Sequence, residues 1–292
     1  MVRVLVPAKI NLFLGVGSPR PDGFHELMTV FHAVNLYEEI TACRASDIRV
    51  RIPGYEKLAS SPNNLAIRAA LALRETYGSP SLGADIQINK SIPVAGGMAG
   101  GSADAAGVLI ACNQLWGLGL SSEQLRKIGA QLGSDIPFSL LAGTALARGR
   151  GEKLQPLIHE GSLHWVVAIN EVGLATPRVF SKFDELGVFG SLVTPKSLVE
   201  ALKVGDVEGV ADNMFNDLAS AALSLRPDLA AVLAAGKAGG ALAGIISGSG
   251  PTCAFLVRNA SAGKDVSAAL AKVPGIRQIV SVEGPAKHAV TF

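Results

Sequence analysis

The stretch that decides the interpretation of the chain is Pro93-Val94-Ala95-Gly96-Gly97-Met98-Ala99-Gly100-Gly101-Ser102-Ala103-Asp104. It follows residues 84–89, where apolar and polar side chains alternate as in a strand, and it leads into residues 105–116, which are rich in helix formers. Glycines therefore stand where a strand turns into a helix. Without Cβ atoms, backbone N–H groups can approach a ligand, and the positive end of the helix favours an anion, typically phosphate. The alternative is a tight turn with close packing and no ligand.

Two common phosphate loops do not fit this stretch. Gly96 and Gly101 have the spacing of a P-loop, but Ser102 stands where a P-loop needs lysine. The adjacent pair Gly96-Gly97 also excludes the GxGxxG pattern of dinucleotide-binding proteins. If the stretch binds phosphate, it belongs to another class of loop.

Composition limits the class of protein. The chain has 292 residues, enough for one large or two medium domains, and 49% of them are hydrophobic with few aromatic side chains, which fits an α/β or α+β enzyme. A formal net charge of +2 and the lack of a basic run indicate no nucleic-acid or membrane surface. Residues 1–6 indicate a strand rather than a signal peptide. Cys43, Cys112 and Cys253 have no metal-ligand spacing, so we expect a cytoplasmic protein with reduced thiols.

The first half of the chain predicts strands and capped helices. Alternation predicts strands over residues 2–6 and 10–16, a turn at 19–23, a long strand through residue 40 and another over 48–52. The pair Asn63-Asn64 and Gly78 delimit a predicted helix, and a capping box of Ser121 with Gln124 starts a second one that ends at Gly133.

The second half predicts strands alternating with helices. Strands are expected over residues 165–169, 242–246, 252–257 and 277–282, and helices over 195–203, 206–223, 228–235 and from an N-cap at Ser261 to Lys272. A charged, glycine-rich turn over 149–156 is the predicted boundary between domains at residues 1–155 and 156–292. The lack of a strict βαβ period indicates an α+β fold.

Lys9 and Asp135 are the candidate catalytic pair. A period of two places Lys9 on one strand face with Asn11 and Phe13, whereas a lone lysine near a chain start is usually at the surface. Asp135 lies between a helix end and a proline, where a turn or a helix cap is the alternative. A carboxylate held beside a cation is the arrangement that a general base for a hydroxyl needs.

Two further segments are candidates for ligand binding. Phe24 and His25 follow an Asp-Gly turn and could stack on a base, although a strand-edge aromatic beside an exposed histidine is the alternative. The break over 248–252, Gly-Ser-Gly-Pro-Thr, could form a second anion nest or a simple hairpin turn. The five histidines have no metal-ligand spacing.

The glycine-rich stretch resembles the phosphate loop of the GHMP kinases, usually Pro-x-Gly-x-Gly-Leu-Gly-Gly-Gly-Ser-Ser-Asn-Ala-Ala. It departs from that pattern at Ala95, Met98, Ala99, Ala103 and Asp104. Four further segments resemble members that phosphorylate a cytidine diphosphate-linked methylerythritol: residues 7–14, 20–27, 132–138 and 247–252. The resemblance implies a two-domain α+β GHMP kinase fold, with the active site in the cleft between the domains.

The resemblance also implies an activity, its cofactors and the residues that carry it. ATP, with Mg²⁺, would phosphorylate the 2-hydroxyl of the cytidyl substrate in the methylerythritol phosphate route to isoprenoids. Lys9 and Asp135 would be catalytic, residues 93–104 would bind ATP, and Ser102 would be a Mg²⁺ ligand. The implied substrate-binding residues are Asn11, Phe24, His25, Thr176, Phe180, Gly248, Ser249 and Gly250.

The partners are small molecules, with no nucleic acid or membrane, and the protein is expected to be a monomer or weak homodimer. The alternatives are a homoserine or mevalonate type of GHMP kinase and a non-catalytic binding protein of this fold.

Overall fold

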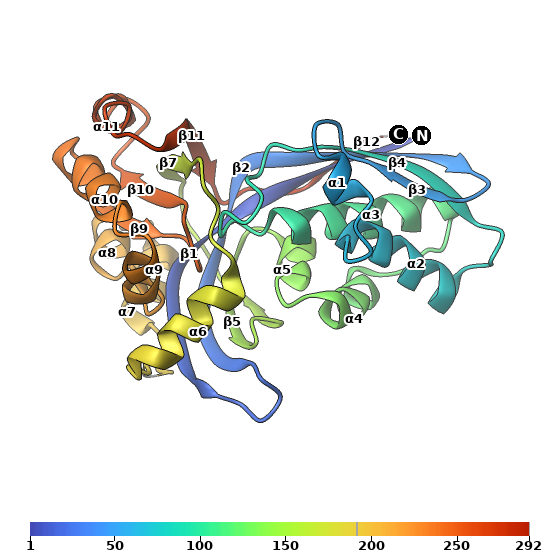
Figure 1. Cartoon of the computed structure of the whole chain (residues 1–292), viewed down its shortest axis with the longest axis horizontal. Coiled ribbons are helices and arrows are strands. Elements are labelled where there is room, and N and C mark those ends of the chain that lie inside the picture. The colour runs from blue at the N-terminus through green and yellow to red at the C-terminus, as the bar shows by residue number, and fades with distance from the viewer. Residues whose placement is uncertain (191, 292) are drawn as a thin grey trace.

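A long antiparallel hairpin runs through the whole molecule. The computed structural model describes residues 1–190 and 192–291. Strand β1 (Val2–Pro19) pairs with β2 (His25–Ala45) along nearly its full length, and Figure 1 shows this blue hairpin running from the region of the chain termini to the bottom of the view. The two short strands predicted over 2–6 and 10–16 are therefore one strand, whose register shifts after Pro7 and after Asn11.

The larger sheet is built on this hairpin. Its strand order is β12-β1-β2-β4-β3, with β5 on β2, β6 on β5 and β8 parallel to β1. The additional strands are β3 (Ile48–Arg51), β4 (Gly83–Asn89), β5 (Thr144–Gly149), β6 (Lys153–Pro156), β8 (Phe215–Asn216) and β12 (Ala289–Thr291). Because β12 pairs with β1, the two chain ends lie side by side, as Figure 1 shows.

A layer of helices covers one face of the larger sheet (Figure 1). They are α1 (Glu56–Ala59), α2 (Leu65–Tyr77), α3 (Gly100–Trp116), α4 (Ser122–Leu132) and α5 (Ile136–Leu141). Helix α3 is apolar on nearly all sides and lies in the centre of the layer, in close contact with β2. A Cβ atom on Gly107 would come within 2.4 Å of Ile40 Cδ1, so glycine is required for this contact.

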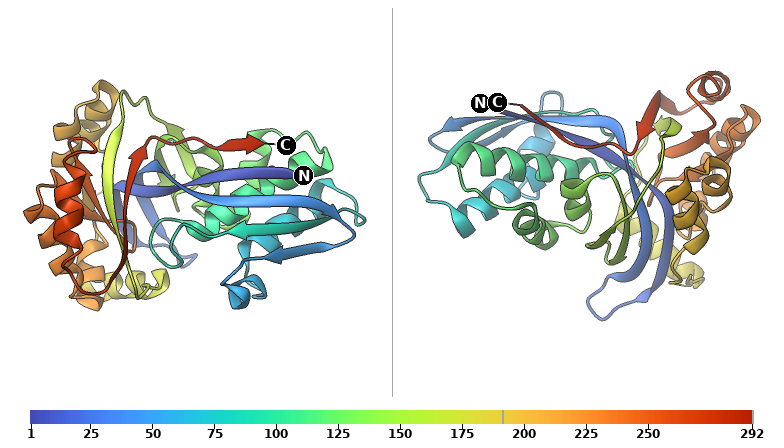
Figure 2. Two further views of the ribbon diagram at one scale, coloured as in Figure 1. Left: turned by 90° about the horizontal axis from the view of Figure 1, so that it is seen from above. Right: turned by 180° about the vertical axis from the view of Figure 1, so that it is seen from behind.

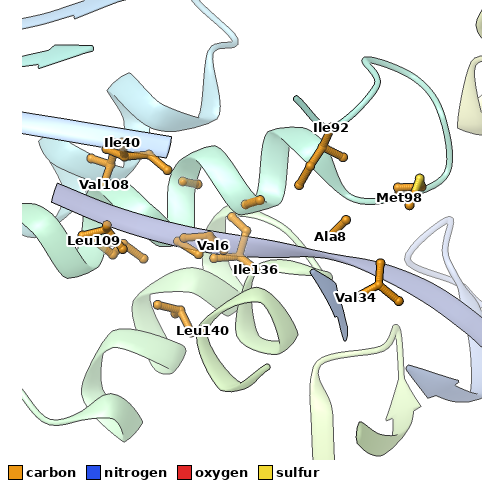
Figure 3. Close-up of a cluster of buried hydrophobic side chains, with 14 of the residues drawn as sticks. Val6, Ala8, Val34, Ile40, Ile92, Met98, Val108, Leu109, Ile136 and Leu140 are labelled. Carbon is orange, nitrogen blue, oxygen red and sulfur yellow. The ribbon is translucent and has the colours of Figure 1, made fainter. Parts of the chain in front are cut away.

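The buried core reaches from the sheet to the glycine-rich loop. Figure 3 shows Val6 and Ala8 of β1 packed with Ile136 at the start of α5 and with Met98 of the loop. Close packing of such a core fixes the positions of the elements that it joins. The loop and the start of α5 are therefore held by the same apolar cluster.

A smaller antiparallel sheet in the order β11-β7-β10-β9 forms the other half of the molecule. Figure 2 shows it at the far end from the chain termini, flanked by helices. The elements here are β7 (Leu163–Asn170), β9 (Ala243–Ile246), β10 (Cys253–Val257), β11 (Ile276–Gly284), α6 (Thr176–Leu186), α7 (Lys196–Val204), α8 (Val207–Asp212), α9 (Ala219–Leu225), α10 (Leu229–Ala238) and α11 (Gly263–Leu270). Two sheets with segregated helices confirm the α+β prediction.

Several helix predictions are confirmed, and three are wrong. Asn64 caps α2, and the capping box of Ser121 and Gln124 starts α4. Helix α3 starts at residue 100 rather than 105, because the loop glycines form its first turn. The helix expected over 206–223 is interrupted by β8, which pairs with β1. Ser261 is not a cap, since α11 begins after Ala262, whose N–H donates to Asn259 Oδ1 at 3.0 Å.

The predicted boundary segment over 149–156 lies inside the larger sheet. Strands β5 and β6 pair as an antiparallel hairpin, and the turn between them occupies residues 150–152. The division at residues 155 and 156 stays a prediction. Among the described residues, none of the helices combines the length and apolarity that crossing a membrane requires.

Candidate active site

Lys9 is buried in the middle of β1, which excludes the surface alternative. Its side chain is 5% exposed, and Nζ donates to Asn11 Oδ1 at 2.5 Å. Asn11 in turn donates to Thr29 Oγ1 at 2.9 Å. Nζ also lies 5.5 Å from the centre of the Phe31 ring. The lysine is therefore held in one orientation by neighbours on both strands of the central hairpin.

Asp135 occupies the N-cap position of α5. In the described part of the chain, its side chain makes no capping hydrogen bond, so the carboxylate does not cap the start of the helix. It lines the same cavity as Lys9. Burial lowers the pKa of Lys9, and the negative charge of Asp135 partly offsets this effect. The two groups thus interact electrostatically, which their distance in sequence could not indicate.

This cavity has a volume of about 530 Å³, and most of the glycine-rich loop lines it. Eight of the twelve loop residues line it: Pro93, Ala95, Gly96, Gly97, Ala99, Gly100, Gly101 and Ser102. The N-terminus of α3 opens onto it, where unpaired N–H groups and the helix dipole favour an anion. Met98 is fully buried in the core, and Ala103 and Asp104 lie behind the loop, so these side chains do not face the cavity.

A second turn, between β9 and β10, forms another part of the cavity wall. Gly248 and Ser249 line the cavity, whereas Gly250 lies behind them. Ser247 Oγ donates to the carbonyl of Gly97 at 3.0 Å, so the two glycine-rich turns are in direct contact. The segment is a hairpin turn, as one of the two alternatives predicted, and it is also part of the cavity wall. The anion nest stays a prediction.

Aromatic side chains form another part of the cavity wall. His25 is 7% exposed, contrary to the exposed alternative, and its Nε2–H donates to Asp184 Oδ1 at 2.8 Å. The His25 and Phe180 rings have their centres 5.0 Å apart. Phe24 is 47% exposed, and the Arg150 guanidinium lies 4.8 Å from the centre of its ring. Thr176, also in the wall, shares a hydrogen bond of 2.8 Å with Ser249.

Comparisons with known proteins show which family the chain resembles. The model for the GHMP kinases N terminal domain matches residues 64–143, and the model for the GHMP kinases C terminal matches residues 198–275. A 4-diphosphocytidyl-2-C-methyl-D-erythritol kinase of Cutibacterium acnes is 48% identical over 99% of this chain and 96% of its own length. The kinase of the same name from Streptomyces coelicolor is 49% identical over 100% of this chain and 99% of its own length.

The chain belongs to the GHMP kinases.

Solved structures agree with this assignment. A crystal structure of 4-(cytidine 5'-diphospho)-2C-methyl-D-erythritol kinase has a TM-score of 0.80 and 32% identity, and it covers 97% of this chain and 100% of its own. A homoserine kinase from Cytophaga hutchinsonii has a TM-score of 0.73 at 20% identity over 100% of this chain and 94% of its own, a likeness of fold alone. The prediction of a GHMP kinase fold is thus confirmed, and the protein is an ATP-dependent kinase.

Sequence reasoning missed several side chains around the site of this GHMP kinase. Arg150 lines the cavity, but it lies in the turn that was interpreted only as a boundary. Asp184 is four residues after Phe180 on α6, a spacing that places both on one helix face beside His25. Asn216 donates to the carbonyls of Ile246 and Gly248 and so supports the second turn. The spacing of Phe180 and Asp184 could have been noticed; the other contacts are made only in the folded chain.

Proposed function

We propose that the protein transfers the γ-phosphoryl group of ATP to the 2-hydroxyl of 4-diphosphocytidyl-2-C-methyl-D-erythritol, giving the 2-phosphate and ADP. The observation that carries this proposal is that one cavity is lined both by a glycine-rich helix N-terminus and by the His25–Phe180 ring pair. The names of relatives at 48–49% identity support the choice of substrate. The active site then lies in a cleft between a domain of residues 1–155 and one of residues 156–292, since both segments contribute to its wall.

Lys9 and Asp135 act on the reacting hydroxyl. Asp135 orients the hydroxyl and accepts its proton as the bond to phosphorus forms, because a neutral hydroxyl is a poor nucleophile. Lys9 places its positive charge within reach of Asp135 and balances the charge that develops during transfer. Asn11 holds Lys9 through the 2.5 Å hydrogen bond and touches the substrate from the same face. Positioning and charge neutralisation supply most of the catalysis in phosphoryl transfer.

The loop over residues 93–104 binds the ATP phosphates through its backbone. Its N–H groups and the first turn of α3 supply the donors. Within the described residues, no group of three His, Cys, Asp or Glu side chains is arranged to hold a metal ion. Ser102 and Asp135 do offer oxygen donors to the cavity, which fits a Mg²⁺ ion that is carried mainly by nucleotide phosphates and water. Bound there, Mg²⁺ would neutralise phosphate charge, and Ser102 is the residue that we assign to it.

The aromatic part of the cavity wall binds the cytidyl group. Phe24 and Phe180 supply ring faces for stacking on the base, and His25 supplies polar groups for its edge. Arg150 places a cation in the same wall, suited to the diphosphate that links base and polyol. Gly248 and Ser249, with Thr176, complete the contact with the substrate, and Gly250 supports their turn from behind the cavity wall.

A substrate panel tests the proposal. Purified protein is incubated with ATP and Mg²⁺ and with the cytidyl substrate, homoserine or mevalonate, and ADP release is measured. We expect turnover with the cytidyl substrate alone. Turnover with homoserine or mevalonate instead would refute the substrate assignment. Binding without any turnover by folded protein would indicate a ligand-binding protein, and Asp135→Asn in parallel shows whether the observed turnover belongs to this site.

A further inference from the structure

Three charged side chains are buried together behind the glycine-rich loop. The side chains of Glu38, Lys90 and Asp104 are 0%, 2% and 6% exposed. Glu38 is in β2, Lys90 directly follows β4, and Asp104 is in the second turn of α3. Removing charges from water is unfavourable unless they are paired and hydrogen-bonded. We call these three residues the Lys90 cluster.

The Lys90 cluster joins three separate elements through one ammonium group. Lys90 Nζ donates to Glu38 Oε1 at 2.6 Å and to the two Asp104 carboxylate oxygens at 2.9 and 3.1 Å. The Glu38 carboxylate also accepts the backbone N–H groups of Ser91 at 2.9 Å and Ile92 at 3.3 Å. The strand, the segment that enters the loop and the helix that leaves it are therefore fixed relative to one another.

The loop between these anchors has an unfavourable backbone conformation. Ala95 and Ala99 have positive φ angles of 51° and 61°, which residues with a Cβ rarely adopt. Such residues persist only where the surrounding structure holds them. The anchor is close, because a Cβ on Gly100 would lie 3.3 Å from Lys90 Nζ. Among the described residues that line the cavity, none belongs to the Lys90 cluster, so its charges act through the loop and not by touching a ligand.

We propose that Glu38, Lys90 and Asp104 are positioning residues that hold the loop in the conformation that binds ATP phosphates. The inference rests on the proposed function, because it takes the loop as the ATP site. When the Lys90 cluster is neutralised, Ala95 and Ala99 can relax and the loop N–H groups lose their alignment. Affinity for ATP then falls, while the aromatic part of the cavity wall keeps its geometry. A cluster that served stability alone would change thermal unfolding and leave both affinities as they are.

The test uses the triple variant Glu38→Gln, Lys90→Met, Asp104→Asn. It leaves no unpaired buried charge, so we expect it to fold, and the glutamine oxygen can still accept from Ser91 and Ile92. Circular dichroism checks the fold, and calorimetric titration with a non-hydrolysable ATP analogue gives its Kd. Loss of one hydrogen bond to a charged phosphate weakens binding by about tenfold or more, so we expect the Kd to rise by at least about that factor. The KM for the cytidyl substrate should stay within about twofold. The exposed pair Glu123 and Lys127, changed to Gln and Met, is the matched control and should have no effect.

Two results would overturn the inference. One is a folded triple variant that binds the ATP analogue like the wild type, and the other is an equal loss for both ligands. If the triple variant does not fold, Glu38→Gln alone keeps the Lys90–Asp104 pair and should still weaken ATP binding without affecting the other substrate; an unchanged Kd there also refutes the inference. Wild-type protein is measured first, so that a failure of the proposed function appears as absent turnover with the cytidyl substrate and is not confused with either result.

Discussion

Gly97→Ala is expected to separate the two glycine-rich turns that close the cavity. Gly97 has a φ of +77°, and an added Cβ would lie 2.1 Å from the carbonyl oxygen of Ser247 and 3.0 Å from the backbone nitrogen of Gly250. The glycine is thus required by the packing of one turn against the other. The tightest contact made by the new methyl group is with protein backbone and not with a ligand.

The magnitude follows from these distances. Ordinary contact begins at 3.4 Å, so the Ser247 carbonyl has to move by more than an ångström, and backbone cannot yield as a flexible side chain does. Left-handed backbone geometry at a non-glycine residue adds roughly 1–2 kcal/mol to the cost of folding. A displacement of about 1 Å in a catalytic site costs about 10²-fold, so we expect kcat/KM to fall by about that factor. The midpoint of thermal unfolding should fall as well.

Gly117→Ala is the matched control. Gly117 has a similar φ of +68° at the end of α3, but an added Cβ there meets nothing within 4 Å. The Gly117→Ala variant should therefore have a lower midpoint of thermal unfolding, because of the strained backbone, and an unchanged kcat/KM. The assay is ADP release with saturating cytidyl substrate and varied ATP, together with an unfolding curve for each variant. The reasoning fails if Gly97→Ala keeps wild-type kcat/KM, or if Gly117→Ala loses as much activity.

Further predictions concern other residues of the cavity wall. Asp135→Asn should lower kcat by about 10²–10⁴-fold with an unchanged Kd for an ATP analogue, the loss typical of a missing general base; near-normal turnover would remove Asp135 from the chemistry. Burial lowers the pKa of Lys9 below its ordinary 10.5, so its charge is lost as pH rises through the lowered pKa and kcat should fall on the alkaline side. In Lys9→Arg, whose guanidinium stays charged, this alkaline loss should disappear from the kcat profile, and a profile identical to the wild type would contradict the role of Lys9. Phe180→Ala should raise the KM of the cytidyl substrate, since a lost stacking contact costs about 1–3 kcal/mol; a larger effect on the KM of ATP would refute the base assignment.

Local sequence patterns predicted the elements whose signals are local. The caps predicted at Asn63-Asn64, where Asn64 is the cap, and at Ser121 are confirmed, because a side chain two or three residues away satisfies the free N–H groups of the helix. The strand before the glycine-rich loop was correct because its alternation reflects one buried face. The helix expected over 206–223 was wrong because β8 within it pairs with Phe13 and Leu14 of β1, some 200 residues earlier. Pairing with a distant strand overrides local helix propensity.

The features of the candidate site likewise fall into those that short sequence segments predict and those that depend on the fold. Residue types in short segments were enough to predict the type of loop, the candidate pair Lys9 and Asp135 and the family of the chain. The folded chain was needed to show that the charge of Asp135 acts on Lys9, that Asp184 holds His25, and that Asp104 is turned away from the cavity. Burial and electrostatic interactions act through space, between side chains that the fold brings together from distant parts of the chain. Helix α3 starts with the loop backbone facing the cavity, whereas the carboxylate of Asp104 points toward Lys90. Packing of the helix against the sheet fixes this orientation.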